Sequence, residues 1–297
     1  MQDKLSVVRP RRSVLYMPGS NARALEKAKT IDADSLILDL EDAVAPDAKE
    51  LARTQVCEAV AAGGYGHREL IIRINGFDTV WGEEDFKKAV EAKPDAILIP
   101  KINSASDLVS ATELLKSLSV DSSIKLWAMM ETPMAMLNAR EIGMVVQEKQ
   151  IPLAAFVMGT NDLSKDTGAK ILPGRQAFLP WLMTCIAAAR VADIDVIDGV
   201  YNNFSDLEGF EQECLQGSEI GMNGKTLIHP KQVDICNRAF APSEEEVEWA
   251  NKVIEAFNLP ENAQKGALKV DGKMVERLHA EVGRKTVAIA EAIASRG

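Results

Sequence analysis

Short apolar runs recur along the chain, and each is followed by a stretch with the hydrophobic spacing of a helix. Eight such runs contain few polar residues: Ser13–Met17, Ser35–Leu40, Leu70–Ile74, Ala96–Pro100, Ile124–Met130, Leu153–Met158, Asp195–Val200 and Thr226–Ile228. Strands that are covered on both faces have this uniformly apolar character. The pattern therefore predicts eight buried parallel strands.

Amphipathic stretches between these runs predict helices, among them Ala22–Ala33, Asp47–Ala62, Asp107–Leu118 and Met134–Val146. Repeated strand–helix alternation of this kind predicts a TIM-type (β/α)8 barrel in the α/β class. An open, doubly wound sheet is the alternative, although such sheets usually contain fewer strands.

The pattern changes after the eighth run. Ser243 and Glu246 form a capping-box pattern, which predicts the start of a helix. Asp271-Gly272 lies between two short apolar runs and predicts a hairpin, which a last helix over 276–294 follows. We therefore predict a barrel domain over residues 1–257 and a C-terminal helical and hairpin lid extension over residues 258–297. The extension would fold over its own barrel or over that of a neighbouring subunit.

Composition narrows the class of protein. Hydrophobic residues make up 46% and charged residues 26% of the chain, as in soluble globular proteins. The four cysteines form no CxxC pair, which indicates reduced thiols rather than a disulfide framework. The polar, basic residues 1–12 lack the apolar core of a signal peptide, and no run is long enough to span a membrane. We expect a cytoplasmic protein with no membrane partner.

Charge narrows the possible ligands. The net charge is −10 and no basic stripe is visible, so a nucleic-acid partner is not expected. With three histidines in the chain, carboxylates are the more plausible metal ligands, which favours Mg²⁺, with Mn²⁺ as an alternative.

Polar or charged side chains stand where nearly every predicted strand ends. They are Asp39, Glu41 and Asp42 after the second strand, then Arg73, Lys101, Glu131, Asp162, Asp198 and His229. The C-terminal strand ends of a β/α-barrel form the mouth in which active sites lie. Burying unpaired charge is unfavourable, so solubility alone does not explain a ring of such residues.

Glu131 and Asp162 end adjacent strands and are the candidate metal ligands. Mg²⁺ typically takes one or two protein carboxylates, together with water and substrate oxygens. Asp39, Glu41 and Asp42 could hold the waters of such a metal. Helix capping is the alternative role for both carboxylates, because a negative charge stabilises a helix N-terminus.

Other candidates have two interpretations each. Arg73, between two isoleucines, points either into the mouth to bind an anion or outward to a structural ion pair. Lys101 either pairs with a carboxylate or acts as a Schiff-base lysine. The turn ending at Asn21 opens a helix and could bind an anion with Lys27, or it is an ordinary turn. His229 either contacts a ligand or orients its loop.

These motifs resemble a known family. The segments that carry the resemblance are Arg12-Ser13 to Pro18-Gly19-Ser20-Asn21, Leu38 to Pro46, Arg73-Ile74-Asn75-Gly76, Ile99-Pro100-Lys101, Glu131-Thr132-Pro133, Gly224-Lys225 and Ile228 to Gln232. The chain is similar over most of its length to the HpcH/HpaI aldolase/citrate lyase family, in the CitE-like branch of citrate lyase β subunits, malyl-CoA lyases and citramalyl-CoA lyases.

The resemblance implies a barrel that assembles as a homotrimer or homohexamer, with the lid exchanged between subunits. It implies Mg²⁺ on Glu131 and Asp162, and Arg73 on the oxygens of a 2-keto acid. It places coenzyme A beside five positions: Tyr16, Asn21, Lys27, Ile228 and His229. The lid of a neighbouring subunit would deliver the acid/base residue, at Glu276.

The chain departs from the family pattern at two positions. Glu276 replaces an aspartate, and one extra methylene moves a proton donor by roughly an ångström, which can lower a rate by about 100-fold. Asn161, in Gly159-Thr160-Asn161-Asp162, replaces the commoner glutamate and removes a negative charge beside the metal position.

We expect from these features a Mg²⁺-dependent acyl-CoA lyase. It would cleave or form a 3-hydroxy-acyl-CoA, such as citramalyl-CoA or malyl-CoA, to acetyl-CoA and a small 2-keto acid, with Arg73, Asp42 and Glu276 as catalytic residues. The alternatives are an acyl-CoA thioesterase, a citrate lyase β subunit acting on a carrier-bound thioester, and a non-catalytic protein that binds CoA esters.

Overall fold

A closed barrel of eight parallel strands forms the larger part of the computed structural model, which describes residues 8–118 and 123–296. The strands follow one another around the barrel in chain order, and β1 closes the ring by pairing with β8. They are β1 (Ser13–Pro18), β2 (Ser35–Asp39), β3 (Glu69–Arg73), β4 (Ala96–Ile99), β5 (Lys125–Met130), β6 (Leu153–Met158), β7 (Asp195–Asp198) and β8 (Gly224–Leu227). The predicted (β/α)8 barrel is confirmed.

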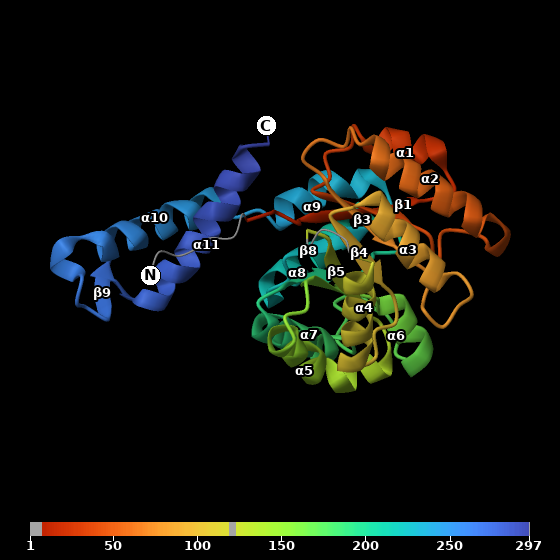
Figure 1. The fold of residues 1–297 in the computed structure, drawn as a ribbon. Coiled ribbons are helices and arrows are strands. Elements are labelled where there is room, and N and C mark those ends of the chain that lie inside the picture. The colour runs from red at the N-terminus through yellow and green to blue at the C-terminus, as the bar shows by residue number, and fades with distance from the viewer. Residues whose placement is uncertain (1–7, 119–122, 297) are drawn as a thin grey trace. The chain divides into compact units, whose positions relative to one another are not determined.

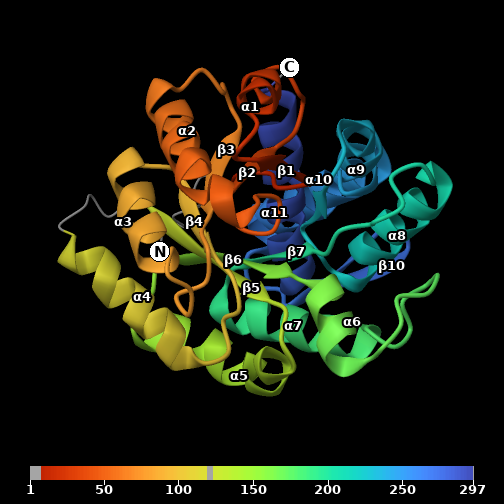
Figure 2. The ribbon, with the colours of Figure 1, turned by 90° about the vertical axis from the view of Figure 1, so that its right-hand side faces the viewer.

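Helices surround the strands on the outside of the barrel (Figures 1 and 2). They are α1 (Ala22–Ala28), α2 (Lys49–Ala62), α3 (Gly82–Ala92), α4 (Ala105–Ser117), α5 (Pro133–Glu148), α6 (Thr160–Thr167), α7 (Leu179–Ala192), α8 (Leu207–Ile220) and α9 (Val233–Ala239), with 3₁₀ turns η1 (Pro46–Ala48) and η2 (Pro230–Gln232). Helix α1 ends before the predicted residue 33, because the N–H groups of Thr30 and Ile31 bond the carbonyls of Lys27 and Ala28 in tighter turns.

Alternate residues of each strand face opposite sides of the sheet, and both sides are apolar. One set fills the barrel: Val14, Ile37, Ile71, Ala96, Leu98, Trp127, Met129, Ala155, Val157 and Ile197, with Tyr16 and Ala154 against it. The other set, which includes Leu36, Ile72 and Phe156, packs beneath the helices in a larger core. Burial on both sides is why the strand sequences show little polar alternation.

Charged groups at the N-terminal ends of the strands are paired with one another. Arg11 lies 2.7 Å from Glu69 and 2.7 Å from Asp195, and its guanidinium lies 5.1 Å from the centre of the Trp127 ring. These contacts satisfy the charges at this end of the barrel. The polar residues predicted for the site lie at the opposite, C-terminal ends of the strands.

Residues 8–10 and 241–296 form a second compact unit, and residues 11–118 and 123–240 form the barrel unit. The second unit contains α10 (Glu244–Asn258), η3 (Pro260–Asn262), β9 (Ala267–Val270), β10 (Lys273–Glu276) and α11 (Arg277–Ala294). The division falls before α10 rather than after residue 257, because Val253 and Phe257 of α10 pack on Val275 and Ala280.

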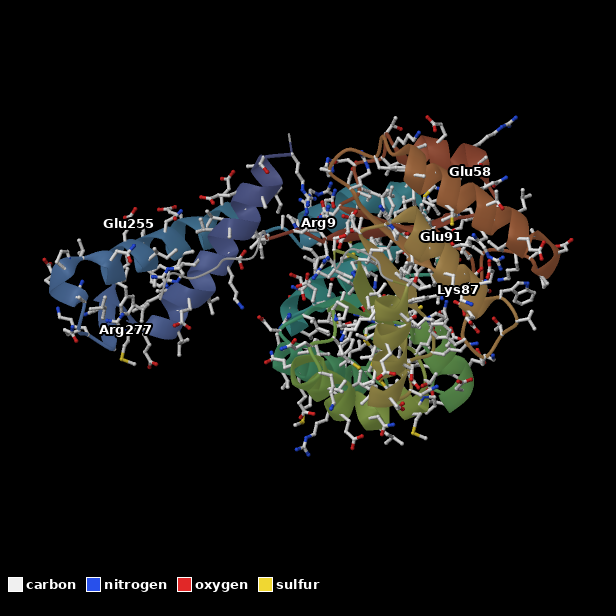
Figure 3. The ribbon with its side chains drawn as sticks, in the orientation of Figure 1. Arg9, Glu58, Lys87, Glu91, Glu255 and Arg277 are labelled. Carbon is white, nitrogen blue, oxygen red and sulfur yellow. The ribbon has the colours of Figure 1, made fainter. Side chains whose placement is uncertain are left out.

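Local signals in the second unit are confirmed. Ser243 caps α10 in a capping box with Glu246, and β9 and β10 form the antiparallel hairpin. Arg277, labelled in Figure 3, begins α11 with its guanidinium 5.7 Å from the centre of the Phe257 ring. Within the two described ranges, no helix is both long and apolar enough to cross a membrane.

Candidate active site

Arg73 and Asp39 are direct neighbours at the C-terminal ends of β3 and β2, because the register pairs these two residues. The side chain two positions before each of them fills the barrel. Because side chains alternate along a strand, Arg73 and Asp39 also point inward. Arg73 Nε and Nη2 donate to the two carboxylate oxygens of Asp39, at 2.6 and 2.7 Å. The guanidinium also lies 4.9 Å from the centre of the Tyr16 ring. Of the two orientations open from the sequence, the structure shows the inward one.

The loop after β2 brings further carboxylates to the same guanidinium. Asp39 accepts hydrogen bonds from the backbone N–H groups of Glu41 and Ala43, at 2.9 and 3.0 Å, which folds the loop over the strand end. As a result, Arg73 Nη1 lies 2.8 Å from Glu41 Oε2 and 3.2 Å from Asp42 Oδ2. One buried cation thus holds three carboxylates from consecutive parts of the chain.

These carboxylates are not equivalent electrostatically. Burial opposes the ionisation of Asp39, but the charge and hydrogen bonds of Arg73 hold its pKa below the usual range. Burial raises the pKa of Glu41 to about 8. The charge of Arg73 lowers this pKa and the charges of the neighbouring acids raise it, so Arg73 offsets only part of the effect of burial. Glu41 Oε2 is buried and makes no hydrogen bond within the described residues, despite its closeness to Arg73. Glu41 is therefore an acid whose ionisation burial opposes and Arg73 favours.

Glu131 follows β5 and is 2% exposed. Its Oε1 accepts a hydrogen bond from the backbone N–H of Lys101, at 2.7 Å. Lys101 adopts a left-handed conformation, with φ of 53°, which is uncommon for a residue other than glycine. Burial, together with the nearby charge of Asp162, raises the pKa of Glu131 to about 7, although the Lys101 bond opposes the rise.

Asp162 lies in the first turn of α6, where β6 ends. Burial and the charge of Asp42 raise its pKa. Gly159 separates this turn from Glu131, and a Cβ at position 159 would lie 2.3 Å from Glu131 Cβ and 2.7 Å from Oε2. Only glycine lets the Glu131 carboxylate approach the backbone so closely.

A cavity of about 300 Å³ opens between these groups at the C-terminal end of the barrel. Its wall includes Tyr16, Asp39, Asp42, Ala43, Arg73, Met129, Met158, Gly159, Thr160, Asn161, Asp162, Val200, Asn202, Thr226 and Ile228. Glu131 is not part of the wall, but its side chain lies against the backbone of Gly159, which is. The structure therefore brings together the predicted Arg73, Asp39, Glu41, Asp42, Glu131 and Asp162.

The residues fit a magnesium ion. Glu131 and Asp162 both have raised pKa values, so a cation between them would relieve an unfavourable burial of like charges. Among the described residues, no three acidic, histidine or cysteine side chains form a metal-binding group. A carboxylate pair is nonetheless a donor set that Mg²⁺ accepts, because it retains several waters and takes substrate oxygens.

Asp198 does not belong to the mouth, contrary to the expectation from its place at a strand end. Its neighbour Ile197 fills the barrel, so Asp198 points outward. Arg175 Nη1 donates to both of its oxygens, at 2.7 and 2.8 Å, and Lys225 Nζ donates at 2.8 Å. Lys225 also bonds Glu213, at 2.7 Å. These four residues form a buried ion cluster between the sheet and α8, which is a structural role.

Of the five positions expected to contact coenzyme A, Tyr16 and Ile228 line the cavity, whereas Asn21, Lys27 and His229 are not part of its wall. Ile228 lines the cavity and is 40% exposed. Asn21 caps α1 by accepting a bond from Ala24 N–H, and Lys27 is exposed on that helix. His229 stacks on Phe204, with ring centres 5.0 Å apart and planes at 7°, while its Nδ1 accepts the Lys231 N–H. The hydrogen bond between His229 and Lys231 thus orients the loop to which His229 belongs.

Two residues of the mouth escaped the sequence analysis. Asn202 exchanges a reciprocal pair of amide hydrogen bonds with Asn161, at 2.7 and 3.2 Å, and both line the cavity. Phe204 stacks on His229. Both residues belong to the Asn202-Asn203-Phe204 segment, whose position after β7 could have indicated that they lie near the mouth of the barrel. Glu276 lies in the second unit as an exposed residue before α11, and its catalytic role stays a prediction.

A larger hollow, of about 540 Å³, lies beside α3 and α4 and includes Phe77, Lys101 and Leu114 in its wall. It contains neither Arg73 nor the Glu131–Asp162 pair. The Lys101 side chain is exposed there, whereas a Schiff-base lysine is activated by burial or by another cation. Arg73, Asp39, Asp42 and Asp162, which were predicted for the site, line the smaller cavity instead.

Comparison with known proteins adds independent findings. Residues 12–230 match the family model described as HpcH/HpaI aldolase/citrate lyase. A (3S)-malyl-CoA thioesterase of Cereibacter sphaeroides is 49% identical over 286 residues, which cover 96% of each chain. A citrate lyase subunit beta of Leuconostoc mesenteroides subsp. cremoris is 32% identical over 274 residues, 91% of this chain and 89% of that protein.

Solved structures agree with the fold. CitE from Mycobacterium tuberculosis, in complex with magnesium, acetoacetate and coenzyme A, has a TM-score of 0.74 at 23% identity, and the match covers 96% of this chain and 100% of that one. RipC from Yersinia pestis has a TM-score of 0.65 at 27% identity, over 80% of this chain and 97% of that one.

Proposed function

Because the chain belongs to the HpcH/HpaI aldolase/citrate lyase family, we propose that it is a Mg²⁺-dependent enzyme that hydrolyses the CoA thioester of a short 3-hydroxy acid such as malyl-CoA. The observation that carries this proposal is the convergence of Arg73, Asp42 and Asp162 in the wall of one cavity, with Glu131 close enough for the charges of Asp162 and Arg73 to act on it. The sequence alone favoured carbon–carbon cleavage. The (3S)-malyl-CoA thioesterase relatives, with 49% identity over nearly the whole chain, support thioester hydrolysis instead.

Glu131 and Asp162 would hold the metal. When bound, Mg²⁺ supplies Lewis-acid polarisation of substrate oxygens. The protein's own part is to keep both carboxylates in place, through the Lys101 N–H on Glu131 and the first turn of α6 under Asp162. The magnesium in the complex of the M. tuberculosis protein supports the choice of metal.

Arg73 would bind the negative oxygens of the substrate. Its fork is fixed by Asp39, so the guanidinium does not reorganise as charge develops on a carbonyl oxygen. In hydrolysis, water oxygen attacks the thioester carbon and the C–S bond breaks. Asp42, which lines the cavity and lies 3.2 Å from Arg73 Nη1, is the group placed to take the water proton and return a proton to the departing thiolate.

A carbon–carbon lyase is the second candidate. The same Arg73 arrangement would bind the oxygens of a 2-keto acid, and the citrate lyase relatives at 32% identity favour this reaction. Glu276, delivered by a neighbouring subunit, would then protonate the enolate of the acetyl thioester. An assembly into homotrimers or homohexamers is part of this proposal.

Incubation of the purified protein with Mg²⁺ and (3S)-malyl-CoA tests both candidates. Free thiol and malate, without glyoxylate, would support the hydrolase. Acetyl-CoA and glyoxylate would support the lyase, and citramalyl-CoA with pyruvate as product tests the larger substrate. Activity only with an acyl-carrier protein would identify a citrate lyase β subunit. Tight binding of the ester without product would leave a non-catalytic binding protein.

A further inference from the structure

Lys49 is a buried lysine that the proposed reaction does not use. It is the first residue of α2, and it is 6% exposed. Its Nζ donates to the backbone carbonyls of Leu40 and Glu41, at 2.9 and 2.6 Å. The ammonium group also lies 5.6 Å from the centre of the Trp81 ring. Lys49 therefore binds the backbone of the loop that carries the acidic residues of the site.

Neither helix formation nor burial favours a lysine at this position. A cation in the first turn of a helix is repelled by the positive end of the helix dipole. Burial lowers the pKa of Lys49, although Asp39 and Glu41 oppose this effect. The two short hydrogen bonds and the acidic field of the loop thus offset an unfavourable placement. The geometry assigns the side chain to the loop rather than to the helix.

A second group holds the same backbone. Asn75 Nδ2 donates to the Leu40 carbonyl at 2.9 Å, and it also donates to Asp85, at 2.6 Å. Asp85, which is fully buried in α3, is bound in turn by Arg53 of α2, at 2.6 Å. The Leu40 carbonyl is therefore bound by two donors, Lys49 of α2 and Asn75 of the loop after β3.

We propose that Lys49 is a positioning residue: it fixes the Leu40–Glu41 backbone so that the Glu41 and Asp42 carboxylates stay against Arg73. The kinetic part of this inference rests on the proposed function. The structural part does not, since it concerns only how the loop after β2 is held. A lysine that merely completed α2 would stabilise the protein without affecting Glu41 or Asp42.

Three full-length variants separate these roles. Lys49→Met removes the ammonium and keeps the length of the side chain. Lys49→Arg keeps a cation that can bond the same carbonyls. Val60→Ala loosens the same helix about three turns further along, at a buried position that is 8% exposed. Amide hydrogen exchange of residues 40–44 is measured for each without substrate, together with kcat and KM for malyl-CoA hydrolysis.

We expect Lys49→Met to speed exchange at Glu41 and Ala43 by at least about tenfold, because opening the loop exposes amides now bound to Asp39. We expect kcat to fall by about 100-fold, as for a displacement of about 1 Å at a reacting group, with KM changed by less than about threefold. Lys49→Arg should recover most of both effects. Val60→Ala should lower thermal stability and leave loop exchange and kcat near wild type.

Unchanged loop exchange in Lys49→Met would overturn the inference, whatever the substrate. So would equal losses of kcat in Lys49→Met and Val60→Ala. Faster loop exchange in Lys49→Met, in a protein whose wild type releases neither thiol nor keto acid from malyl-CoA, would support the positioning role and refute the proposed function instead.

Discussion

Arg73 and Asp39 face each other across one register position of β3 and β2, and the guanidinium binds both carboxylate oxygens, at 2.6 and 2.7 Å. This fork fixes the plane of the guanidinium. Its remaining nitrogen, Nη1, is then directed to Glu41, Asp42 and the cavity. The guanidinium surface that we propose to bind a substrate anion is therefore set by a bond within the protein.

Replacing Arg73 by lysine tests this geometry. Lysine keeps the charge but cannot form the two-pronged bond to Asp39 and still present a nitrogen to the cavity. We expect kcat/KM for malyl-CoA to fall by roughly 10²- to 10³-fold, as when a preorganised donor is removed from an active site. Steady-state kinetics with a thermal melt as control would check it. Near-normal turnover in Arg73→Lys would contradict a role for the fork in catalysis.

The proposed metal site predicts weaker Mg²⁺ binding in Glu131→Gln. The amide keeps the shape of the side chain but removes the negative charge that Mg²⁺ requires. Calorimetric titration should show that Mg²⁺ affinity falls by more than about tenfold, as for loss of one charged ligand of several. Glu58→Gln, on the exposed face of α2, is the matched control and should titrate as wild type. Equal Mg²⁺ binding by Glu131→Gln would refute the assignment.

Gly159→Ala should disable the site through a single methyl group. The added Cβ would lie 2.3 Å from Glu131 Cβ, well inside van der Waals contact, so the Glu131 side chain has to move. Displacing Glu131 also strains its bond to the Lys101 N–H. We expect weaker Mg²⁺ binding and a loss of kcat of about 100-fold. Gly266→Ala, at an exposed glycine with no described neighbour within 4 Å of an added Cβ and no left-handed φ, is the contrasting variant, expected to bind Mg²⁺ as wild type does.

Acid should destabilise the protein through Asp198. Burial would raise its pKa, but Lys225 and Arg175 together hold its pKa below the usual range. Since the folded-state pKa lies below the unfolded value of about 3.9, Asp198 stabilises the fold above that pH. The contribution is lost as pH falls below about 4 toward the folded-state pKa.

Urea unfolding from pH 7 to pH 3 measures this effect. Asp198→Asn should lower the free energy of unfolding at pH 7 by about 3–5 kcal/mol, because two buried cations lose their partner. Its stability should also depend less on pH below about 4 than that of wild type. Parallel pH curves for the two proteins would show that Asp198 is not the responsible group.

Glu276→Asp tests the proposed choice between hydrolysis and carbon–carbon cleavage. Shortening the side chain by one methylene restores the residue expected in lyases of this family. We expect the ratio of glyoxylate to free thiol formed from malyl-CoA to rise, by up to about 100-fold if acid placement limits cleavage. Glu276→Ala should abolish any glyoxylate formation. A product ratio that is the same in all three proteins would exclude Glu276 from the reaction.

The barrel could be predicted because its strands are apolar on both faces and alternate with helical patterns. That same uniformity concealed which face of each strand is inside. Arg73 and Asp198 each end a strand, yet one points into the barrel and the other toward α8. The direction in which each side chain points depends on the strand register and on closure of the barrel. The sequence of a single strand does not encode either of these.

Contacts between distant segments account for most of what was missed. Arg175 stands in an irregular loop with no periodicity, and only the fold brings it to Asp198. Likewise, Glu131 is bound by the backbone N–H of Lys101. The sequence pattern suggested a role only for the lysine side chain. The acidic loop after β2 was recognised because its residues are consecutive, and its partner Arg73 because an arginine within an apolar run is unusual.

The pairing of β1 with β8 has a consequence for synthesis of the chain. The cavity takes Tyr16 from one side of this junction and Ile228 from the other. A chain emerging from the ribosome exposes the strand of Tyr16 long before its neighbour exists. The cavity therefore cannot form until β8 has been made, and a nascent chain short of β8 would present an open sheet edge for chaperones to bind.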